Sequence, residues 1–182
     1  GSQAFVDFEF LKDFKFSIKG DISVRNSENQ TYNNAIIGDG AGNKGRASRT
    51  FYRYKNYTFQ QQLTWKKEFG LHNIDLLVGH ENFDYNYAYH YGYKTTETFQ
   101  GGTELINFTE ITNLTGYQVA YRTESYLSRA RYNYDNKYFA EASFRRDGSS
   151  RFHPDYRWGN FWSIGGSWTI SKENFMAGTK DY

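Results

Sequence analysis

Apolar and polar residues alternate without interruption from Phe14 to Val24. The even positions hold Phe, Ile, Val or Gly, and the odd positions hold Lys, Ser or Asp. Because successive side chains of a strand point to opposite sides, this pattern predicts a strand with one uncharged face and one solvated face. Its 11 residues match the ~9–11 residues that a tilted strand needs to cross a bilayer, whereas strands of soluble domains usually have about 5–6. The length therefore indicates a membrane barrel.

The composition restricts the class of protein. No run of 18 apolar residues occurs in the 182-residue chain, which excludes a transmembrane helix. The mean hydropathy of −0.85 is still compatible with a barrel wall, since half of each strand would face a polar lumen. The 20% aromatic content favours strands, and the net charge of +2 is too balanced for an electrostatic nucleic-acid binder. With no Cys, thiol chemistry and disulfides are excluded.

Seven strands are predicted along the chain, joined by connections of unequal length. Apart from the first alternating segment, they lie at roughly 5–11, 50–65, 72–79, 126–134, 138–145 and 158–170. The connections run short (12–13), long (25–49), short (66–70), long (up to about 117), short (135–136) and medium (147–157). Outer-membrane barrels have tight turns at one end and longer loops at the other. We therefore expect an all-β, antiparallel up-and-down meander that forms a segment of a transmembrane β-barrel.

The two faces of these strands differ in charge. The faces assigned outward are almost uncharged in their middles, and their aromatic residues near the short turns would form an interfacial girdle: Phe14, Trp65, Tyr134, Tyr138 and Trp168. The opposite faces carry charges that we expect to point into the lumen, among them Arg129, Arg131, Glu141 and Arg145. The alternative is a soluble β-rich carbohydrate-binding module, in which the uncharged faces meet in a core between two sheets.

Three motifs in the last third of the chain occur in a characteristic order. They are Tyr-Asn-Tyr-Asp-x-Lys-Tyr at 132–138, Arg-Arg-Asp-Gly-Ser-Ser-Arg-Phe at 145–152, and Arg-Trp-Gly at 157–159, followed by Ser-x-Gly-x-Ser-Trp and Ser-x-Glu-x-Phe-Met. In these motifs the chain resembles the SusC/RagA family of TonB-dependent outer-membrane transporters. By itself, the second motif predicts a turn that ends a strand, with Gly148 at positive φ.

The resemblance implies a mid-barrel fragment of a nutrient importer for glycans or peptides. Family members have an N-terminal plug, a barrel of about 22 strands and a SusD-like surface lipoprotein as a lid. Residues 1–182 would then be a partial receptor barrel without the plug, and Gly1-Ser2 resembles a cloning scar. The implied partners are outer-membrane lipid, the SusD-like lipoprotein and, through the missing plug, the TonB system. The charged inward residues 129, 131, 141 and 145 would face the lumen or the plug.

Five tyrosines at alternating positions form a second candidate site: Tyr85, Tyr87, Tyr89, Tyr91 and Tyr93. All five share one face if the fourth strand continues through them. Rings with a polar tip suit contact with a ligand or with the lid, and they suit an interfacial girdle or a cross-strand ladder equally. The sequence leaves both interpretations open.

Other motifs carry no function in our interpretation. Gly40-x-Gly42-x-x-Gly45 matches a dinucleotide fingerprint by letter, but it follows a loop and opens no helix. The four histidines are scattered, and no catalytic, cofactor or metal site is expected. An isolated seven-stranded segment would have two open edges. We expect it to self-associate through its first and last strands, near Phe8 and Trp168.

Overall fold

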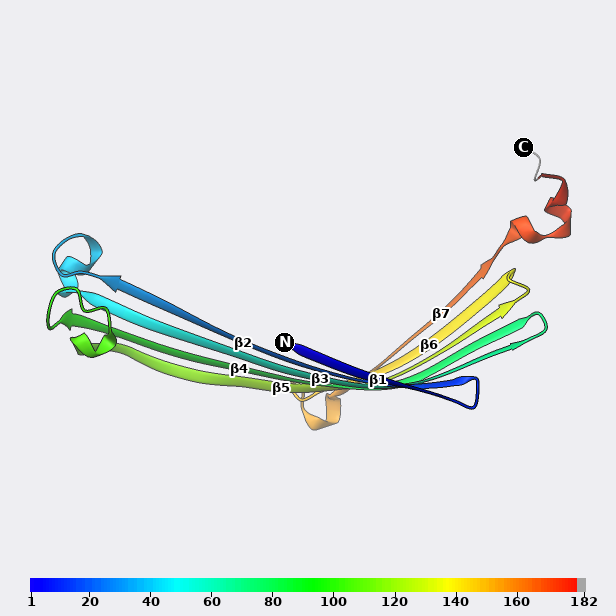
Figure 1. Cartoon of the computed structure of the whole chain (residues 1–182), viewed down its shortest axis with the longest axis horizontal. Coiled ribbons are helices and arrows are strands. Elements are labelled where there is room, and N and C mark those ends of the chain that lie inside the picture. Colours follow the sequence, from blue (N-terminus) through cyan, green and yellow to red (C-terminus); the bar gives the residue numbers. More distant parts are fainter. Residues whose placement is uncertain (180–182) are drawn as a thin grey trace. The chain divides into compact units, whose positions relative to one another are not determined.

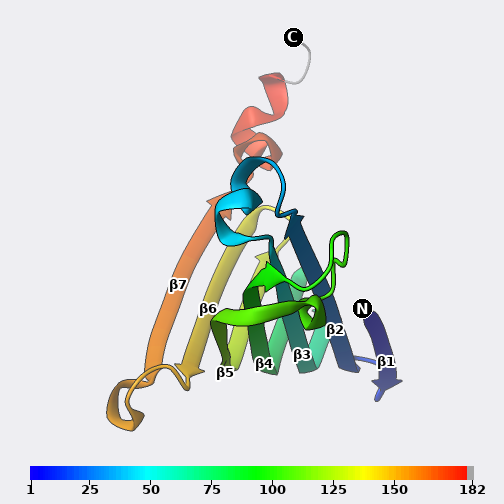
Figure 2. The ribbon, with the colours of Figure 1, turned by 90° about the vertical axis from the view of Figure 1, so that its left-hand side faces the viewer.

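The computed structural model describes residues 1–179, and its strands form one seven-stranded sheet in the order of the chain. The predicted meander is thus confirmed (Figure 1; Figure 2). The strands are β1 (Ser2–Phe10), β2 (Phe14–Asn33), β3 (Arg46–Phe69), β4 (His72–Glu97), β5 (Phe108–Tyr134), β6 (Tyr138–Ser149) and β7 (Trp158–Trp168). Short 3-10 helices are η1 (Gly38–Asn43), η2 (Leu105–Asn107), η3 (Pro154–Tyr156), η4 (Ile170–Lys172) and η5 (Asn174–Thr179). In the described part of the chain, no helix is long and apolar enough to span a membrane.

The chain forms two compact units. The first consists of Gly1 with residues 22–56 and 84–120, and the second consists of residues 2–21, 57–83 and those from 121 onward. Strands β2 to β5 contribute residues to both units. The two long connections, 34–45 and 98–107, belong to the first unit, whereas the three tight turns and the loop at 150–157 belong to the second.

The tight turns of the second unit owe their geometry to backbone in the left-handed region. Leu11 and Lys12 have φ of 50° and 59°, and Asp135 and Asn136 have φ of 52° and 50°. Two consecutive positive φ values are typical of the type I′ turns that join antiparallel strands, and Asn and Asp tolerate them best. The turn at Asp135 and Asn136 joins β5 to β6, and Tyr134 lies opposite Tyr138 in that pair.

The long connections of the first unit are hydrogen-bonded to the strands beside them. The first binds the end of β4, and in the second the backbone N–H of Gly101 donates to the Tyr32 hydroxyl of β2 at 3.2 Å. The backbone nitrogens of Thr96 and Glu97 donate to the carbonyls of Gly45 and Lys44, at 3.0 and 2.9 Å. Within the second connection, Asn107 is only 5% exposed, and its amide donates to the carbonyls of Phe99 and Gly102, both at 2.9 Å. Both loops lie next to each other in Figure 1. Hydrogen bonds therefore help to order both loops.

Several predicted boundaries are wrong: β2 to β5 continue beyond the predicted strands, and β7 is shorter than predicted. The predicted loop 25–49 shrinks to 34–45, since β2 runs on to Asn33 and β3 already begins at Arg46. The long connection predicted up to about residue 117 is also shorter, because β4 runs to Glu97 and β5 already begins at Phe108. At the end of the sheet, β7 stops at Trp168 instead of residue 170. In β2 and β3, polar residues continue the ladders, so the alternation of hydropathy ends before the backbone pairing does.

The predicted turn at Gly148 is also wrong. Residue 148 lies within β6, opposite Trp158, and it is not among the residues with positive φ. A Cβ atom there would lie 2.8 Å from the Trp158 ring. Glycine is therefore required at this position because the indole packs directly on the backbone, and not because the chain turns.

The sheet has no apolar core of the kind that a two-layer soluble domain contains. Among the described residues, the buried hydrophobic side chains are Ala47 and Phe108. By contrast, Trp162 and Ile164 on β7 are 75% and 77% exposed. The uncharged faces do not meet between two sheets, which contradicts the arrangement expected for the soluble carbohydrate-binding alternative.

Candidate functional site

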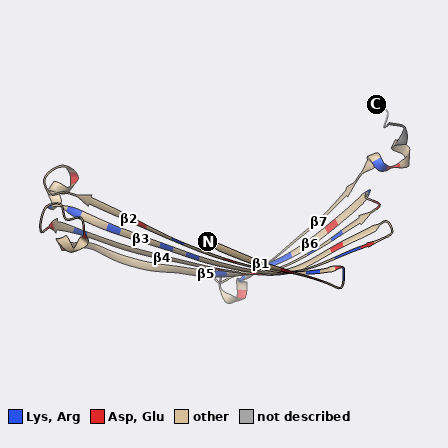
Figure 3. Cartoon of the chain, viewed as in Figure 1, with Lys and Arg blue, Asp and Glu red and all other residues tan. Residues whose placement is uncertain are grey.

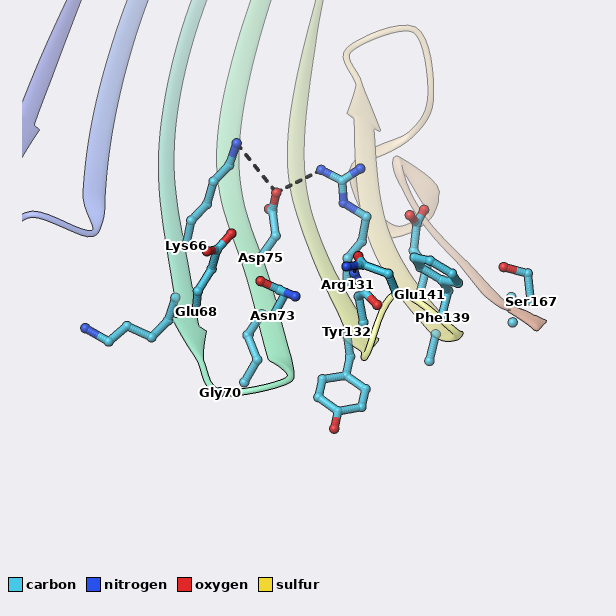
Figure 4. A pocket seen from close by; sticks show the side chains of 17 residues that line it. Lys66, Glu68, Gly70, Asn73, Asp75, Arg131, Tyr132, Phe139, Glu141 and Ser167 are labelled. Carbon is cyan, nitrogen blue, oxygen red and sulfur yellow. Dashed lines mark hydrogen bonds and ion pairs between the residues drawn. The ribbon is translucent and has the colours of Figure 1, made fainter. Parts of the chain in front are cut away.

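A polar groove of about 830 Å³ lies in the second unit, beside the tight turns. Its charged lining side chains come from four neighbouring strands, β3 to β6, and they include Lys66, Asp75, Arg131 and Glu141 (Figure 4). Figure 3 shows that both basic and acidic residues occur along the strands of the sheet. These residues share one side of the sheet because each lies on the polar side of its strand's alternation. The groove therefore brings together charges that are far apart in the sequence.

Asp75 pairs with two of the cations that line this groove. Its Oδ2 accepts a hydrogen bond from Arg131 Nη2 at 2.8 Å and forms an ion pair with Lys66 Nζ at 3.8 Å. The side chain is 18% exposed, and its other oxygen, Oδ1, is buried without a hydrogen-bond partner among the described residues. Figure 4 shows both cations directed at the carboxylate. Among the described residues, Oδ1 of Asp75 thus remains available as a hydrogen-bond acceptor after Lys66 of β3 and Arg131 of β5 have both paired with Oδ2.

The structure brings two of the four predicted inward residues into this groove. Glu141 lies directly opposite Arg131 in the register of β5 and β6, while the Arg131 guanidinium reaches across to β4. Arg145 lies elsewhere on the same side, where its Nε donates to both oxygens of Asp147 at 2.7 and 2.9 Å. The Nε of Arg129 is buried and has no hydrogen-bond partner in the described part of the chain. Whether these side chains face a lumen or a plug stays a prediction.

The opposite side of β4 to β7 is uncharged across its middle. Ala142 lies between Ala130 and Ile164, and Phe144 lies opposite Trp162. Phe144 is 45% exposed. A sheet face with this many exposed large apolar side chains needs an apolar environment, such as lipid.

Aromatic residues border this apolar side beside the tight turns, as the sequence predicts. The ring of Tyr138 stacks between those of Tyr134 and Trp168, with centroids 6.2 and 6.3 Å away. The Tyr138 hydroxyl and the Trp168 indole N–H donate to Oε1 of Glu173, at 2.6 and 3.0 Å. Both bonds hold the pKa of Glu173 below its usual value. The segment after β7 is thereby attached to the aromatic border.

The five alternating tyrosines lie in one strand, β4, within the first unit. Since β4 continues to Glu97, all five share one side of the strand, as expected for a continuing strand. The rings of Tyr87 and Tyr89 are central in a cluster, and Tyr91 stacks on Tyr89 at 6.5 Å. Tyr85 and Tyr93 continue the same alternation before and after them. These tyrosines alternate in step with Asp75, so by strand geometry they belong to the polar side of β4.

Three further tyrosines complete this aromatic cluster, and sequence reasoning missed them. Tyr54 lies 4.9 Å from Tyr87, and Tyr52 lies 5.3 Å from Tyr89, measured between ring centroids. From β5, Tyr117 lies 5.2 Å from Tyr89. The spacing of Tyr52 and Tyr54 on β3 already shows the same period of two. The sequence therefore shows the alternation of the tyrosines, but it does not show the register that aligns β3, β4 and β5.

The glycine-rich segment and His72 have structural roles. A Cβ at Gly40 would lie 2.2 Å from the carbonyl oxygen of Asn34, and Gly45 has a φ of 86°. Both positions thus require glycine to close the loop around η1. His72 Nδ1 lies 2.6 Å from the Tyr132 hydroxyl. Within residues 1–179, no group of three His, Asp or Glu side chains is arranged to hold a metal ion.

Curated proteins similar to the chain are all TonB-dependent receptors. A TonB-dependent receptor of Formosa agariphila is 29% identical over 182 residues, covering 93% of the chain and 17% of that receptor. The TonB-dependent receptor SusC of Bacteroides thetaiotaomicron is 30% identical over 127 residues, covering 70% of the chain and 12% of SusC. The chain thus spans less than a fifth of the curated relatives it matches. No protein-family model matches the chain.

Solved structures with the same fold include the RagAB peptide transporter. The chain superimposes on it with a TM-score of 0.87 at 20% identity, covering 94% of the chain and 20% of that structure's chain. The RagAB importer in its 'open-open' state matches with a TM-score of 0.82 at 19% identity, covering 90% of the chain and 18% of that structure's chain. This similarity establishes the arrangement of the strands.

Proposed function

The chain belongs to the SusC/RagA-like family of TonB-dependent receptors, and we propose that it forms part of the barrel wall and of the extracellular loops of a nutrient importer. The substrates would be glycans or peptides. Residues 1–182 form a partial barrel without a plug domain in this proposal. The segment itself has no catalytic role and needs no cofactor.

The observation that carries the proposal is the chemical difference between the two sides of the sheet. On one side, exposed apolar residues such as Phe144, Trp162 and Ile164 suit contact with lipid. On the other side, Asp75 and Arg131 form a charged ladder that needs water or a polar partner. Receptors of this family lie in the outer membrane, where a barrel wall separates these two environments.

The polar groove would contact the plug, which connects the receptor to the TonB system. The free Oδ1 of Asp75 offers a buried acceptor to a donor from that domain. A photo-crosslinker on Glu141→Cys in the full-length receptor should react with the plug. The same group on Ala140→Cys, whose side chain points to the other side of β6, should not. Equal crosslinking at both positions would contradict this assignment of the groove.

The tyrosine cluster of the first unit would contact the ligand or the SusD-like lipoprotein. Of the eight tyrosines in this cluster, Tyr87 and Tyr89 are the best candidates for this contact. Their rings contact tyrosines of both β3 and β5. Aromatic rings with hydroxyl groups bind both sugar faces and peptide side chains. The cluster alone thus supports either substrate class.

The isolated segment would self-associate, because β1 and β7 are the outer strands of its sheet. Phe8 and Trp168 on these strands are 55% and 49% exposed. In a complete barrel, neighbouring strands would cover both edges. Sedimentation of the purified segment in detergent-free buffer should show assemblies larger than a monomer, and a stable monomer would contradict this expectation.

Uptake by cells is the direct test of the proposed function. Cells that carry the full-length receptor should accumulate labelled oligosaccharides or peptides while the inner membrane is energised. Dissipating the proton gradient or deleting the receptor gene should abolish this uptake. Unchanged uptake in the deletion strain would refute the proposed import function.

A further inference from the structure

Strand β5 extends far beyond its pairing with β6. The last pair of that ladder joins Thr123 to Ser149, whereas β5 begins at Phe108. Every residue from 109 to 120 is exposed, including Ile111 at 68% and Leu114 at 76%. Figure 1 shows this part of β5 as the outermost strand of the first unit, beside β4. Within residues 1–179, no strand therefore pairs with this edge of β5 over residues 109 to 120.

The hydrogen-bonding groups on this open edge belong to the even-numbered residues. The carbonyl of Arg122 points toward β6, because it accepts a hydrogen bond from the backbone N–H of Ser150 at 2.9 Å. Just before β5, the carbonyl of Asn107 at the end of η2 accepts a hydrogen bond from the backbone N–H of Thr98, which follows β4, at 2.7 Å. Since a strand alternates these directions, the N–H and C=O groups of the even residues from 110 to 120 point away from β4.

This edge lacks the features that usually prevent strand addition. Between residues 109 and 120, Glu110 is the single charged residue, and there is no Lys or Pro. Five of the twelve residues are β-branched, at positions 109, 111, 112, 115 and 119. Natural proteins normally protect long open edges with Lys, Pro or a bulge. A bare edge of this length is suited to pairing with another chain.

The aromatic cluster lies directly beside the open edge. Tyr117 of β5 contacts Tyr87 and Tyr89 of β4, with ring centroids 5.9 and 5.2 Å away. Tyr117 is itself 53% exposed. In a sheet, side chains of an added strand lie next to those of the edge strand on the same face. Alternate side chains of an added strand would thus pack next to Tyr117.

We propose that the edge of β5 from Glu110 to Ala120 binds an extended peptide by strand addition. The inference rests on the proposed import function and assigns peptide as the substrate class. The edge repeats one N–H and one C=O about every 6.8 Å, which is two residues of strand. A peptide backbone has the same repeat, whereas the hydroxyl groups of a glycan do not. Main-chain pairing would provide affinity, and the tyrosines would select among side chains.

Proline at edge-directed positions tests the inference in the full-length receptor. The double variant Thr112→Pro/Gln118→Pro removes two N–H groups that point away from β4, so the ladder to β4 keeps its bonds. The matched control, Thr112→Val/Gln118→Ala, removes the same side-chain groups and keeps both N–H groups. With a pool of fluorescent casein peptides as the probe, we expect at least ten-fold weaker binding by the proline variant. The control should bind within two-fold of the wild type.

Hydrogen exchange provides a second readout that does not depend on how the variants fold. In the wild-type receptor, casein peptides should slow exchange at the amides of Thr112, Leu114 and Gln118. The amides of odd residues, already bonded to β4, should not change. Peptide binding without this protection, or equal binding by the proline and control variants, would overturn the inference.

The remaining outcomes separate the inference from the proposed function. Binding and import of a maltooligosaccharide, with no binding of any peptide, would overturn the inference and leave the import function intact. Import of neither class would refute the import function itself. If the proline variant binds peptides normally but loses its co-purifying lipoprotein, the edge is a lid-docking surface and the inference is wrong.

Discussion

Placing an arginine at the middle of the apolar side should strongly destabilise the receptor. Ala142 lies halfway between Tyr138 and Arg146 on this side of β6, four residues from each. At about 3.3 Å per residue and a tilt of about 40°, each end lies roughly 10 Å away in depth. Its cross-strand neighbours, Ala130 and Ile164, offer no partner for a charge. We therefore expect Ala142→Arg to lower the free energy of unfolding by ~2–4 kcal/mol.

The matched control is the next residue on the same strand. Ser143 points to the polar side, where its Oγ lies 2.8 Å from Oγ of Ser163. Ser143→Arg loses that hydrogen bond, which is worth about 0.5–1.5 kcal/mol, but it buries no charge in lipid. Reversible folding of the full-length receptor into lipid vesicles, followed against denaturant, measures both changes. Equal destabilisation by the two variants would refute the assignment of the two sides.

Two further predictions concern Gly148 and Glu173. Gly148→Ala should lower the free energy of unfolding by about 1–3 kcal/mol, because the new Cβ overlaps the Trp158 ring. Gly165→Ala, which has open space at its Cβ, should be nearly neutral in the same denaturation assay. The lowered pKa of Glu173 means that its bonds stabilise the fold above the pKa of a free glutamate and are lost as the pH falls through the folded-state value. Trp168 fluorescence should therefore change in acid, and Glu173→Gln should abolish that change.

The sequence predicts the strands well where one side of the strand meets an apolar environment. From Phe14 to Val24, the alternation follows directly from the difference between the two sides, and β2 includes this whole segment. Beyond Val24 the residues are polar on both sides, so periodicity in hydropathy disappears while the backbone ladder continues to Asn33. The same reason explains the loop predicted at 25–49. In β4 the alternation continues, but the apolar residues change sides, from the even positions 74–78 to the odd positions of the tyrosines.

The sites were predictable only within single strands. The shared side of Tyr87 and Tyr89 follows from their spacing, but their contacts with Tyr52, Tyr54 and Tyr117 depend on the register of three strands. Register is set by turn geometry and pairing over long distances, which no local pattern contains. For the same reason, the Arg-Arg-Asp-Gly motif alone predicts a turn at Gly148. Its requirement comes from Trp158 on the next strand.

The central claim is that one side of this sheet faces lipid and the other faces a polar interior. Spin labels on single cysteines at positions 139 to 145 of the full-length receptor in bilayers test it directly, since this segment has no cysteine of its own. Labels at 140, 142 and 144 should be accessible to oxygen dissolved in the lipid, with a maximum at 142. Labels at 139, 141, 143 and 145 should instead be accessible to a water-soluble nickel complex. Equal accessibility at odd and even positions, or the reverse pattern, would contradict the account.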